Sequence, residues 1–557
     1  MKNIKIIPLG GLRESGKNMY IVEINDDIYI LDVGFRYPEN DMLGIDVVIP
    51  EFTYLEENAH KIAGVFLTHG HPDAMGALPY FLSKFDVPVF GTELTIELAK
   101  FLVSENEESA GFDDFHVINA NSNIEFENVN ISFFATTHSI PDGLGIVIET
   151  EQGSIVYTGD FKFDMGATSG YETDFARLVE IGNKGVLALL SDSSNAEVRE
   201  QLASEIEAGE VVADTIANWE GRIIVACVAS NLQRVEQIIN GAYKAGRKIV
   251  LSSTDLEKIV RTAIRLNKLN IPADINFVSP KNIRKIPDNE LLVLETGRMG
   301  EPLKTLQRMA NQTNRLLSIK EGDLVYITTS PNSSMETVVF KTEDMVYRAG
   351  GVTKHVNDDV RVSGHATAND LKLLIKLLKP QNLIPIGGEY RELIAHAKLG
   401  RESGLAKNHI VTATNGDVIE TDVKEGVSLA GSVPAASLMI DGIGSSDIGN
   451  VVLNDRRMLS EDGVFVAIAT INRREKKIVA SPVINSRGFV YAKASRELLN
   501  ESSVLVKETI EKYLTKDDFE WGKIKSDVRD ALGKYLFNET KRRPVILPII
   551  MESKNIK

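Results

Sequence analysis

Residues 64–74 read GVFLTHGHPDA, a short apolar run that ends in two histidines spaced two apart and then a carboxylate. The run predicts a buried strand, and the glycine, proline and polar residues behind it predict a tight turn that opens a helix after Asp73. Comparable runs with polar ends are GSIVYTGDF (153–161) and GVLALLSDS (185–193). The alternation of strand, polar turn and helix predicts a layered α/β fold with its ligand sites at strand ends.

The size and composition of the chain narrow its class. At roughly 150 residues per domain, 557 residues correspond to three or four folded units. A hydrophobic content of 43% and a charged content of 25% are typical of globular proteins, and the net charge of −16 argues against coating nucleic acid by bulk electrostatics. Any nucleic-acid site therefore has to be a local patch.

The cellular setting is also constrained by composition. The single cysteine, Cys227, excludes an intrachain disulfide and a cysteine metal cluster, and fits a reducing cytoplasm. The start, MKNIKIIPLGG, reaches glycine before any apolar region of signal-peptide length. No stretch approaches the roughly 18 apolar residues of a membrane span. We expect neither export nor membrane insertion.

The pattern of apolar runs changes along the chain. Residues 19–34, MYIVEINDDIYILDVG, predict a hairpin that turns at Asn25–Asp27. RIIVACVAS (222–230) and RKIVLSS (247–253) flank a helical segment and predict a separate doubly wound domain. The expected order is a first domain over 1–197, an insertion over 198–362, completion of the first domain over 363–425, a Gly/Ser/Asp-rich linker over 426–450 and a C-terminal α+β domain over 451–557.

The histidine motif is the main candidate for chemistry. Two imidazoles two residues apart can point at one metal ion, and the carboxylate of Asp73 can reach a second cation. An isolated motif of this kind is usually a polar turn. Here the chain has nine histidines, and the expected cluster also draws on residues that follow other extended runs, namely His138, Asp160 and His365. The sequence therefore predicts a metal centre built at several strand ends.

These motifs resemble a known superfamily. The H-x-H-x-D motif, the later lone histidine and the T-G-D turn, in that order, resemble the metallo-β-lactamase superfamily, and the inserted domain, SDSSNAE (191–197) and Ser363–His365 narrow the resemblance to the β-CASP nucleases. Further segments are similar to bacterial ribonuclease J over nearly the whole chain: GGLRESGKN (10–18), MLGIDVVIP (42–50), IGGEYR (386–391) and TKRRPVILPIIME (540–552). The resemblance implies an αββα sandwich, an inserted β-CASP α/β domain and a small C-terminal α+β domain.

The resemblance also implies an activity. In that family two zinc ions activate water against an RNA phosphodiester, and the enzyme digests RNA 5′ to 3′ from a monophosphorylated end, with some endonucleolytic cutting, in mRNA turnover and rRNA maturation. By motif correspondence the first zinc is held by His69, His71 and His138, with Asp160 between the sites and Asp73 on the second. Mn²⁺ or Mg²⁺ are alternative ions. The expected catalytic residues are Asp73, Asp192 and His365.

The sequence departs from the family at the second metal site. Ala74 stands where the motif has its last histidine, and Gly387 stands where I-P-x-H-G-E-Y-R has its histidine. Because zinc takes about four ligands, we expect one firmly held ion. The pattern resembles the degenerate second paralogue that some Gram-positive bacteria carry beside an active one. Two roles follow, a weak exoribonuclease or a feeble or inactive partner subunit that stabilises and modulates an active paralogue.

The expected phosphate site lies near the second half of the first domain. Motif correspondence assigns the terminal RNA phosphate to Ser363, Gly364 and His365, with Arg361 and Val362 just before them. Ser230 and Asn231 open a helix and are either a second phosphate contact or a helix cap. The expected partners are RNA with a 5′-monophosphate end, further copies of the chain as a dimer or higher oligomer, and an active paralogue, within an RNA degradosome; no membrane is expected.

One motif points elsewhere. Gly11–Asn18 matches the nucleotide-binding G-x₄-G-K pattern except at its last position. A phosphate-binding loop requires Ser or Thr there and a helix after it. This chain has Asn18 and then a strand, so we do not expect nucleotide hydrolysis.

Overall fold

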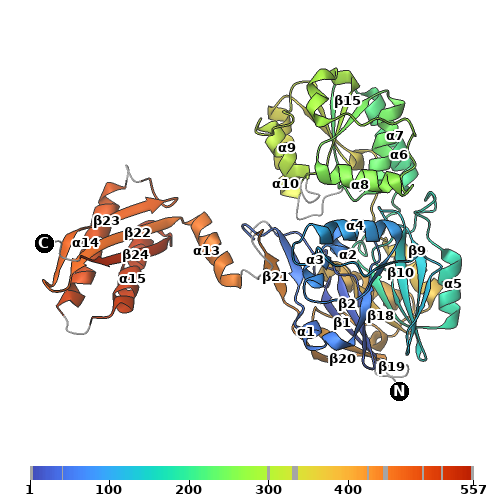
Figure 1. Ribbon diagram of the computed structural model, residues 1–557, viewed down its shortest axis with the longest axis horizontal. Coiled ribbons are helices and arrows are strands. Elements are labelled where there is room, and N and C mark those ends of the chain that lie inside the picture. The colour runs from blue at the N-terminus through green and yellow to red at the C-terminus, as the bar shows by residue number, and fades with distance from the viewer. Residues whose placement is uncertain are drawn as a thin grey trace. The chain divides into compact units, whose positions relative to one another are not determined.

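The computed structural model describes residues 4–39, 42–297, 302–328, 336–422, 426–442, 449–491, 495–515 and 519–553 (Figure 1). The chain divides into two compact units, Met1–Tyr37 with Val48–Ser437, and Pro38–Val47 with Leu438–Lys557. The domain boundaries given above stay a prediction. Among the helices of the described residues, none has both the length and the apolar composition that a membrane span requires.

Two sheets form the centre of the first unit. The eight-stranded sheet has the order β20-β19-β1-β2-β3-β5-β6-β7 and the six-stranded sheet the order β18-β12-β11-β10-β9-β8. Their inner faces share one apolar core, which contains Tyr29, Phe66 and Phe133. The strands of the first sheet are β1 (Ile4–Gly10), β2 (Met19–Ile24), β3 (Asp27–Leu31), β5 (Ile62–Phe66), β6 (Val89–Gly91), β7 (Phe115–Val117), β19 (Asp417–Asp422) and β20 (Gly426–Ser432). Those of the second are β8 (Asn123–Glu125), β9 (Asn130–Thr136), β10 (Gly143–Thr150), β11 (Gly153–Tyr157), β12 (Val186–Asp192) and β18 (Asn382–Ile386).

Helices cover the outer faces of both sheets and complete the αββα sandwich (Figure 1). A second apolar core joins the six-stranded sheet to its helices through Leu178, Leu371 and Leu399. On this side lie α5 (Phe175–Lys184), α11 (Ala368–Leu378) and α12 (Tyr390–Glu402); on the other lie α1 (Thr53–Glu57), α2 (Pro72–Met75), α3 (Leu78–Leu82) and α4 (Glu93–Ser104). The metallo-β-lactamase fold is thereby confirmed.

The predicted hairpin is present as β2 and β3. The strands pair antiparallel, with Ile24 opposite Asp27. The turn places Asn25 at φ 58°, a left-handed conformation that asparagine adopts more readily than most residues. The segment just before β2 does not have the features of a nucleotide-binding loop. Lys17 is buried, pairs with Glu14 at 3.1 Å and is followed by a strand.

A third, entirely parallel sheet forms the inserted domain. Its order is β14-β15-β13-β16-β17. Figure 1 shows α6 and α7 on one side of this sheet and α9 and α10 on the other, as expected for a doubly wound domain. The elements are α6 (Glu205–Asn218), β13 (Ile223–Ala226), α7 (Leu232–Lys244), β14 (Lys248–Leu251), α8 (Thr254–Arg265), β15 (Leu291–Glu295), α9 (Pro302–Ala310), β16 (Leu324–Ile327), α10 (Glu336–Arg348) and β17 (Val352–His355).

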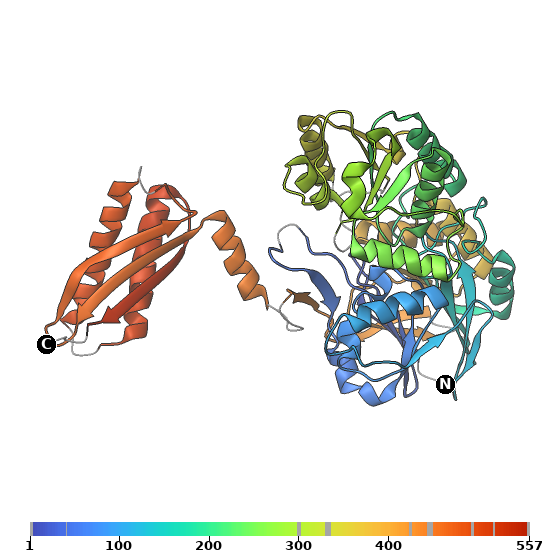
Figure 2. The same cartoon turned by 45° about the horizontal axis from the view of Figure 1, so that its top comes forward.

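The second unit contains a three-stranded sheet of order β23-β22-β24. Both long helices lie against one face of it and enclose a core around Phe465, Ile510 and Leu532 (Figure 2). This is the predicted C-terminal α+β domain. Its elements are α13 (Gly449–Glu461), β22 (Val464–Asn472), β23 (Lys477–Arg487), α14 (Arg496–Leu514), α15 (Trp521–Thr540) and β24 (Val545–Glu552).

The segment expected to be a linker, 426–450, is partly regular. It includes β20, which pairs with β19 in the eight-stranded sheet, and the short strand β21 (Ser437–Ile440). The Gly- and Ser-rich composition of GVSLAGS hid this strand, whose burial pattern shows it mostly exposed. An exposed edge strand has little need for the apolar residues by which strands are recognised.

A buried ion network connects the sandwich to the inserted domain. The Nζ of Lys162, two residues after Asp160, lies 3.0 Å from Glu205 Oε1 at the start of α6. The other Glu205 oxygen accepts from Arg234 Nη2 of α7 at 3.0 Å. All three side chains are buried. Glu205 is therefore the anion between two cations that cannot reach water.

We expect Glu205→Ala to destabilise the protein by about 3–5 kcal/mol, because it leaves the buried Arg234 without its counter-ion and Lys162 with only Asp164, 3.6 Å away. Glu210→Ala is the matched control, since Glu210 is exposed on the same helix and should change stability by less than about 0.5 kcal/mol. Urea unfolding of both variants measures the difference. Equal unfolding free energies for the two variants would contradict the role of the network.

Candidate metal centre and phosphate site

Three histidines meet at the ends of two strands. His69 and His71 follow β5, and His138 follows β9 in the other sheet of the sandwich. One ring nitrogen from each lies within 4.8 Å of the others, and all three side chains are buried. The rings meet edge to face, with centroids 4.8 to 4.9 Å apart.

The outer nitrogen of His69 is held by a buried chain of hydrogen bonds. The Thr68 hydroxyl donates to the Asp32 carboxylate at 2.8 Å, so its oxygen is left to accept from His69 Nδ1 at 2.9 Å. Asp32 also accepts from the Thr68 backbone N–H at 2.8 Å and from the Tyr157 hydroxyl at 2.6 Å. Burial raises the pKa of Asp32 to about 7 despite these donors. His69 is thereby fixed with Nε2 unprotonated.

Backbone carbonyls fix the other two rings. His71 Nε2 donates to the carbonyl of Ser230 at 3.1 Å, and His138 Nδ1 donates to the carbonyl of Gly364 at 2.7 Å. A carbonyl oxygen only accepts, so each ring presents a lone pair on its remaining nitrogen. These nitrogens, His71 Nδ1 and His138 Nε2, lie 3.0 Å apart. A side chain at position 364 would place its Cβ 2.9 Å from His138 Cε1, so this close approach requires glycine.

This arrangement fits a divalent metal. Burial lowers the pKa of His69 and His138 well below the usual range, and the neighbouring imidazoles lower it further, so both rings are neutral. Burial also lowers the pKa of His71. Three neutral imidazoles with converging lone pairs would repel without a cation between them. His69 Nε2 is buried without a hydrogen-bond partner, as expected for a ligand atom.

Carboxylates line the adjoining side. Asp160 Oδ2 and Asp73 Oδ1 lie 4.0 and 3.7 Å from His69 Nε2, and these three residues form a second group that could hold a metal. Burial raises the pKa of Asp160 well above its usual range, and the charges of Asp73 and Asp192 raise it further. Asp73 Oδ1 is buried without a hydrogen-bond partner. Clustered carboxylates of this kind are stabilised by cations.

His365 and Asp192 form an ion pair beside these groups. His365 Nδ1 donates to Asp192 Oδ2 at 2.7 Å, and the other Asp192 oxygen accepts from the Ser194 N–H and hydroxyl. Burial would raise the pKa of Asp192, but the charge of His365 and these hydrogen bonds lower it. Burial would lower the pKa of His365, yet the nearby carboxylates, Asp192 first, raise it to about 10. His365 Nδ1 is thus held by Asp192, and its Nε2 is the ring nitrogen left for another partner; Asp160, Asp192 and His365 also form a third group that could hold a metal.

The resemblance expects further metal ligands at positions 74 and 387, and this expectation stays a prediction. Ala74 is fully buried in α2, directly after Asp73. Gly387 follows β18 at φ 58°, and a Cβ built there lies 3.1 Å from Asp192 Oδ1. A side chain at 387 would therefore point into the group of carboxylates. The second site as it stands offers Asp73 and Asp160, and its assignment stays a prediction.

Of the residues expected to bind the terminal phosphate, Ser363 and His365 lie together, whereas Arg361 lies apart from the histidine cluster. Ser363 Oγ accepts from Asn195 Nδ2 at 2.7 Å and from the His365 backbone N–H at 3.1 Å, so its own hydrogen remains for a ligand. Val362 is buried. Arg361 is exposed and pairs with Glu200 at 2.6 Å, outside the histidine cluster. Its predicted contact with RNA phosphate is untested.

Ser230 and Asn231 have distinct contacts. The Asn231 side chain caps α7 by accepting from the Arg234 N–H at 2.9 Å, which is the structural alternative considered from the sequence. Ser230 contributes its backbone carbonyl to His71. The neighbouring Gln233 N–H donates to the carbonyl of Ser139, next to His138. The inserted domain therefore contacts the surroundings of two candidate metal ligands.

Sequence reasoning missed Asp32, Thr68 and Asn195. Asp32 ends the strand run IYILD, so its place at a strand end was a usable signal. Thr68 directly precedes the histidine motif, and Asn195 lies within SDSSNAE. Each acts on a residue distant in sequence, which residue spacing does not indicate.

The fold and the site define a class of protein, the β-CASP type of metal-dependent hydrolase built on a metallo-β-lactamase sandwich. Family models match the chain in succession: the metallo-β-lactamase superfamily over residues 12–210, the ribonuclease J β-CASP domain over 220–345, a Zn-dependent metallo-hydrolase RNA specificity domain over 354–412 and the ribonuclease J C-terminal domain over 451–553.

Comparison with individual proteins is more specific. Ribonuclease J 2 of Streptococcus pyogenes serotype M3 is 53% identical over 552 residues, covering 99% of this chain and all of the relative. Ribonuclease J 2 of Staphylococcus aureus strain N315 is 42% identical over 554 residues, covering 99% and 98%. The chain belongs to the ribonuclease J family. A crystal structure of a protein of unknown function from Enterococcus faecalis V583 shares the fold, with TM-score 0.53 at 16% identity, over 75% of this chain and 100% of that one.

We expect Asp32→Asn to weaken binding of the first metal ion about 10- to 100-fold, the usual effect of removing the partner of a metal-ligating histidine. An amide at position 32 can donate to Thr68 Oγ1. The threonine hydroxyl would then donate to His69 Nδ1 and shift the proton to Nε2, the ligand atom. Titration of metal-free protein with Zn²⁺ against a chelating dye measures the affinity.

Asp26→Asn makes the same chemical change at an exposed turn and serves as the control. It should bind zinc as the unmodified protein does. An unchanged affinity in Asp32→Asn, with the fold intact by circular dichroism, would show that the tautomer of His69 is set in another way.

Proposed function

We propose that this chain is a metal-dependent ribonuclease of low turnover that removes nucleotides from 5′-monophosphorylated RNA ends, in mRNA turnover and rRNA maturation. The observation that carries the proposal is the position of His365 beside the three converging imidazoles. The ring centroid of His365 lies 5.5 Å from that of His138. The site thus combines a metal-binding group and a proton donor. Endonucleolytic cutting by the same groups is part of the proposal.

The metal and the chain have separate tasks. His69, His71 and His138 would hold the first ion, with Asp160 beside it, and Asp73 would contribute to a weak second site. Zinc, or Mn²⁺ or Mg²⁺ in its place, supplies a Lewis acid that lowers the pKa of water and offsets phosphate charge. Asp160 and Asp73 lie where a carboxylate can accept a proton from water.

His365 is the proposed general acid. A 5′ to 3′ enzyme that requires a 5′-monophosphate must leave one on the shortened RNA, so the P–O3′ bond breaks and the 3′-oxygen leaves. That oxygen needs a proton. His365 holds one on Nε2 while Asp192 fixes the ring through Nδ1. Asp192 also stabilises the imidazolium before transfer.

Ser363 and Gly364 are the proposed contacts for the terminal phosphate, followed by Arg361 and Val362 on the same segment. The Ser363 hydroxyl is held by Asn195 and keeps a free hydrogen to donate. Ser230 and Asn231, at the opening of α7, offer a second phosphate contact with RNA. A built pocket for one phosphate would exclude a triphosphate by size and bind a bare hydroxyl poorly.

Low turnover follows from Ala74 and Gly387. The same two residues favour a second role, in which the chain stabilises and modulates an active ribonuclease J paralogue within an RNA-degrading assembly. We further propose that the chain forms homodimers or larger oligomers. The buried thiol of Cys227, which has no possible disulfide partner within the chain, fits a cytoplasmic setting.

The phosphate contact is tested by comparing RNA ends. We expect RNA with a 5′-monophosphate to be shortened faster than the same RNA with a 5′-triphosphate or a 5′-hydroxyl. Ser363→Ala should reduce this preference about 10- to 100-fold, because one hydrogen bond to a charged group contributes about 1.5–3 kcal/mol. Gel analysis of end-labelled RNA gives the three rates.

Ser204→Ala, which removes an exposed hydroxyl that caps α6, is the control and should keep the preference of the unmodified protein. Equal rates on all three ends would contradict the phosphate site. Absence of cleavage on every end, with metal bound, would favour the partner role.

Restoring the missing ligands tests the proposed reason for low turnover. We expect the unmodified protein to retain one ion per chain after dialysis, and Ala74→His with Gly387→His to retain two and cleave at least tenfold faster, a change of about 1.4 kcal/mol in the barrier. Because position 387 is left-handed, a histidine there should cost about 1–2 kcal/mol of stability. Elemental analysis, rates and urea unfolding report the three quantities.

Each single substitution is the control for the pair and should raise the rate much less. Two retained ions without faster cleavage would locate the defect elsewhere. Residues singled out from the sequence for that case, Arg298–Met299 and Asn332–Ser333, lie outside the described residues.

A further inference from the structure

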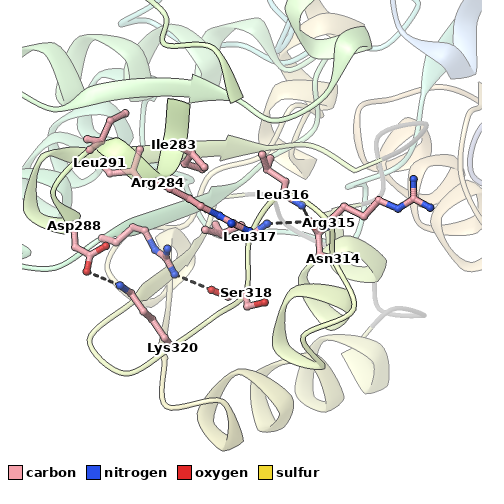
Figure 3. Close-up of a pocket in the computed structure, with 12 residues that line it drawn as sticks. Ile283, Arg284, Asp288, Leu291, Asn314, Arg315, Leu316, Leu317, Ser318 and Lys320 are labelled. Carbon is pink, nitrogen blue, oxygen red and sulfur yellow. Dashed lines mark hydrogen bonds and ion pairs between the residues drawn. The ribbon is translucent and has the colours of Figure 1, made fainter. Parts of the chain in front are cut away.

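A cationic groove runs along the inserted domain, away from the histidine cluster. It consists of two adjoining cavities of about 350 and 740 Å³, which share Asn314, Arg315 and Leu316 as lining residues. We call it the arginine groove, after its five cationic lining residues: Arg222, Arg284, Arg308, Arg315 and Lys320. Figure 3 shows the smaller cavity. A concentration of cations is notable in a chain of net charge −16.

Within the part of the chain that the structure describes, three of these cations have partners and two have none. Arg222 is buried against Asp323 at 3.0 Å, Lys320 pairs with Asp288 at 2.6 Å, and Arg308 donates to the neutral Thr305 hydroxyl. No hydrogen bond or ion pair among the described residues involves the exposed guanidiniums of Arg284 and Arg315. In Figure 3 the Arg315 side chain extends away from Asp288 and Lys320 with no dashed line to it.

A third cavity, lined mostly by apolar side chains, lies between the arginine groove and the histidine motif and shares lining residues with both. That cavity, of about 220 Å³, is lined by Gly70 and Pro72 of the histidine motif and by Ser230, whose carbonyl holds His71. It shares Asp255 and Gly297 with the larger cavity of the arginine groove. A chain of shared lining residues therefore leads from the histidine motif, past the carboxyl end of β15, to Arg315 and then Arg284.

The lining chemistry suits a phosphate backbone. Besides the guanidiniums and the carboxylates of Asp255 and Glu295, the larger cavity presents hydroxyls from the residues after β14 and from the α9 region: Ser252, Ser253, Thr254, Thr305 and Thr313. Arginine and hydroxyl side chains are common phosphate contacts. No aromatic side chain is found among the described lining residues, so the groove offers no stacking surface for a base. A mononucleotide would need such a surface to be recognised, whereas an RNA strand can be held by its phosphates alone.

We propose that the arginine groove is a second RNA-binding site that holds the phosphates of the single strand downstream of the 5′ end under cleavage. The inference rests on the proposed ribonuclease function. Arg284 and Arg315 are the principal contacts, and Arg308 adds a third. The groove makes binding stronger for long RNA than for short RNA without reading its sequence, because phosphates are the same at every nucleotide.

The test measures RNA binding to metal-free protein, so that it does not depend on cleavage. Two 5′-monophosphorylated oligouridines are compared by fluorescence anisotropy, a trinucleotide and a strand of about 16 nucleotides, a span within the usual site size of single-strand binders. For the unmodified protein we expect tighter binding of the long strand. In the double variant Arg284→Ala, Arg315→Ala we expect most of this length preference to be lost.

The salt dependence supplies a second readout. Each phosphate contact on a single strand contributes about 0.7 to the slope of log K against log salt, so the double variant should lower the slope for the long strand by about 1.4. Lys244→Ala is the control for charge, because Lys244 ends α7 on the other side of the inserted sheet (Figure 1). It should keep the slope and the length preference.

The outcomes separate the two proposals. Binding of both oligouridines with an unchanged slope and length preference in the double variant would overturn the arginine groove and leave the ribonuclease function standing. An equal loss of affinity for both lengths would also overturn it, since the trinucleotide cannot reach beyond the 5′ end. Failure of the unmodified protein to bind either RNA would overturn the ribonuclease function, and the groove with it.

Discussion

The candidate site depends on the orientation of three buried imidazole rings. Each of His69, His71 and His138 donates its outer N–H to an oxygen, and each therefore directs a lone pair at the same small volume. The hydroxyl of Thr68 and two backbone carbonyls thus decide which nitrogens can bind metal, and the fold has to bring all three oxygens to the rings.

This requirement explains why the insertion is part of the site. The carbonyl for His71 belongs to Ser230, at the start of α7 in the inserted domain, and the carbonyl for His138 belongs to Gly364, at the return to the sandwich. The ion network of Lys162, Glu205 and Arg234 fixes α6 and α7 to the sandwich close to Asp160. A displacement of the inserted domain would remove the partner of His71 and change the ligand set.

The sequence was sufficient for the fold and for the ligand types. Alternating runs predicted the layered α/β class, and the histidine spacing after β5 predicted part of the observed histidine cluster, because short-range geometry at a strand end depends on local residues. The contacts from Ser230 and Gly364 could not be foreseen, since a backbone carbonyl is present at every residue and only the tertiary fold selects one. The role of Arg361 at the terminal phosphate stays a prediction, and its exposed side chain pairs with Glu200 in the protein without RNA.

The backbone conformation at position 387 would strain the histidine that the family motif has there. Gly387 has φ 58°, and this left-handed conformation costs a residue with a Cβ roughly 1–2 kcal/mol. A histidine at this position would be strained, and only the free energy of binding a cation would offset the strain. Strained residues at functional sites commonly arise in this way. In the proposed two-ion site, absence of the ligand at position 74 as well would leave a second ion weakly held, and the compensation would disappear. Glycine at 387 and alanine at 74 are then consistent with each other: loss of one ligand removes the physical reason to retain the other.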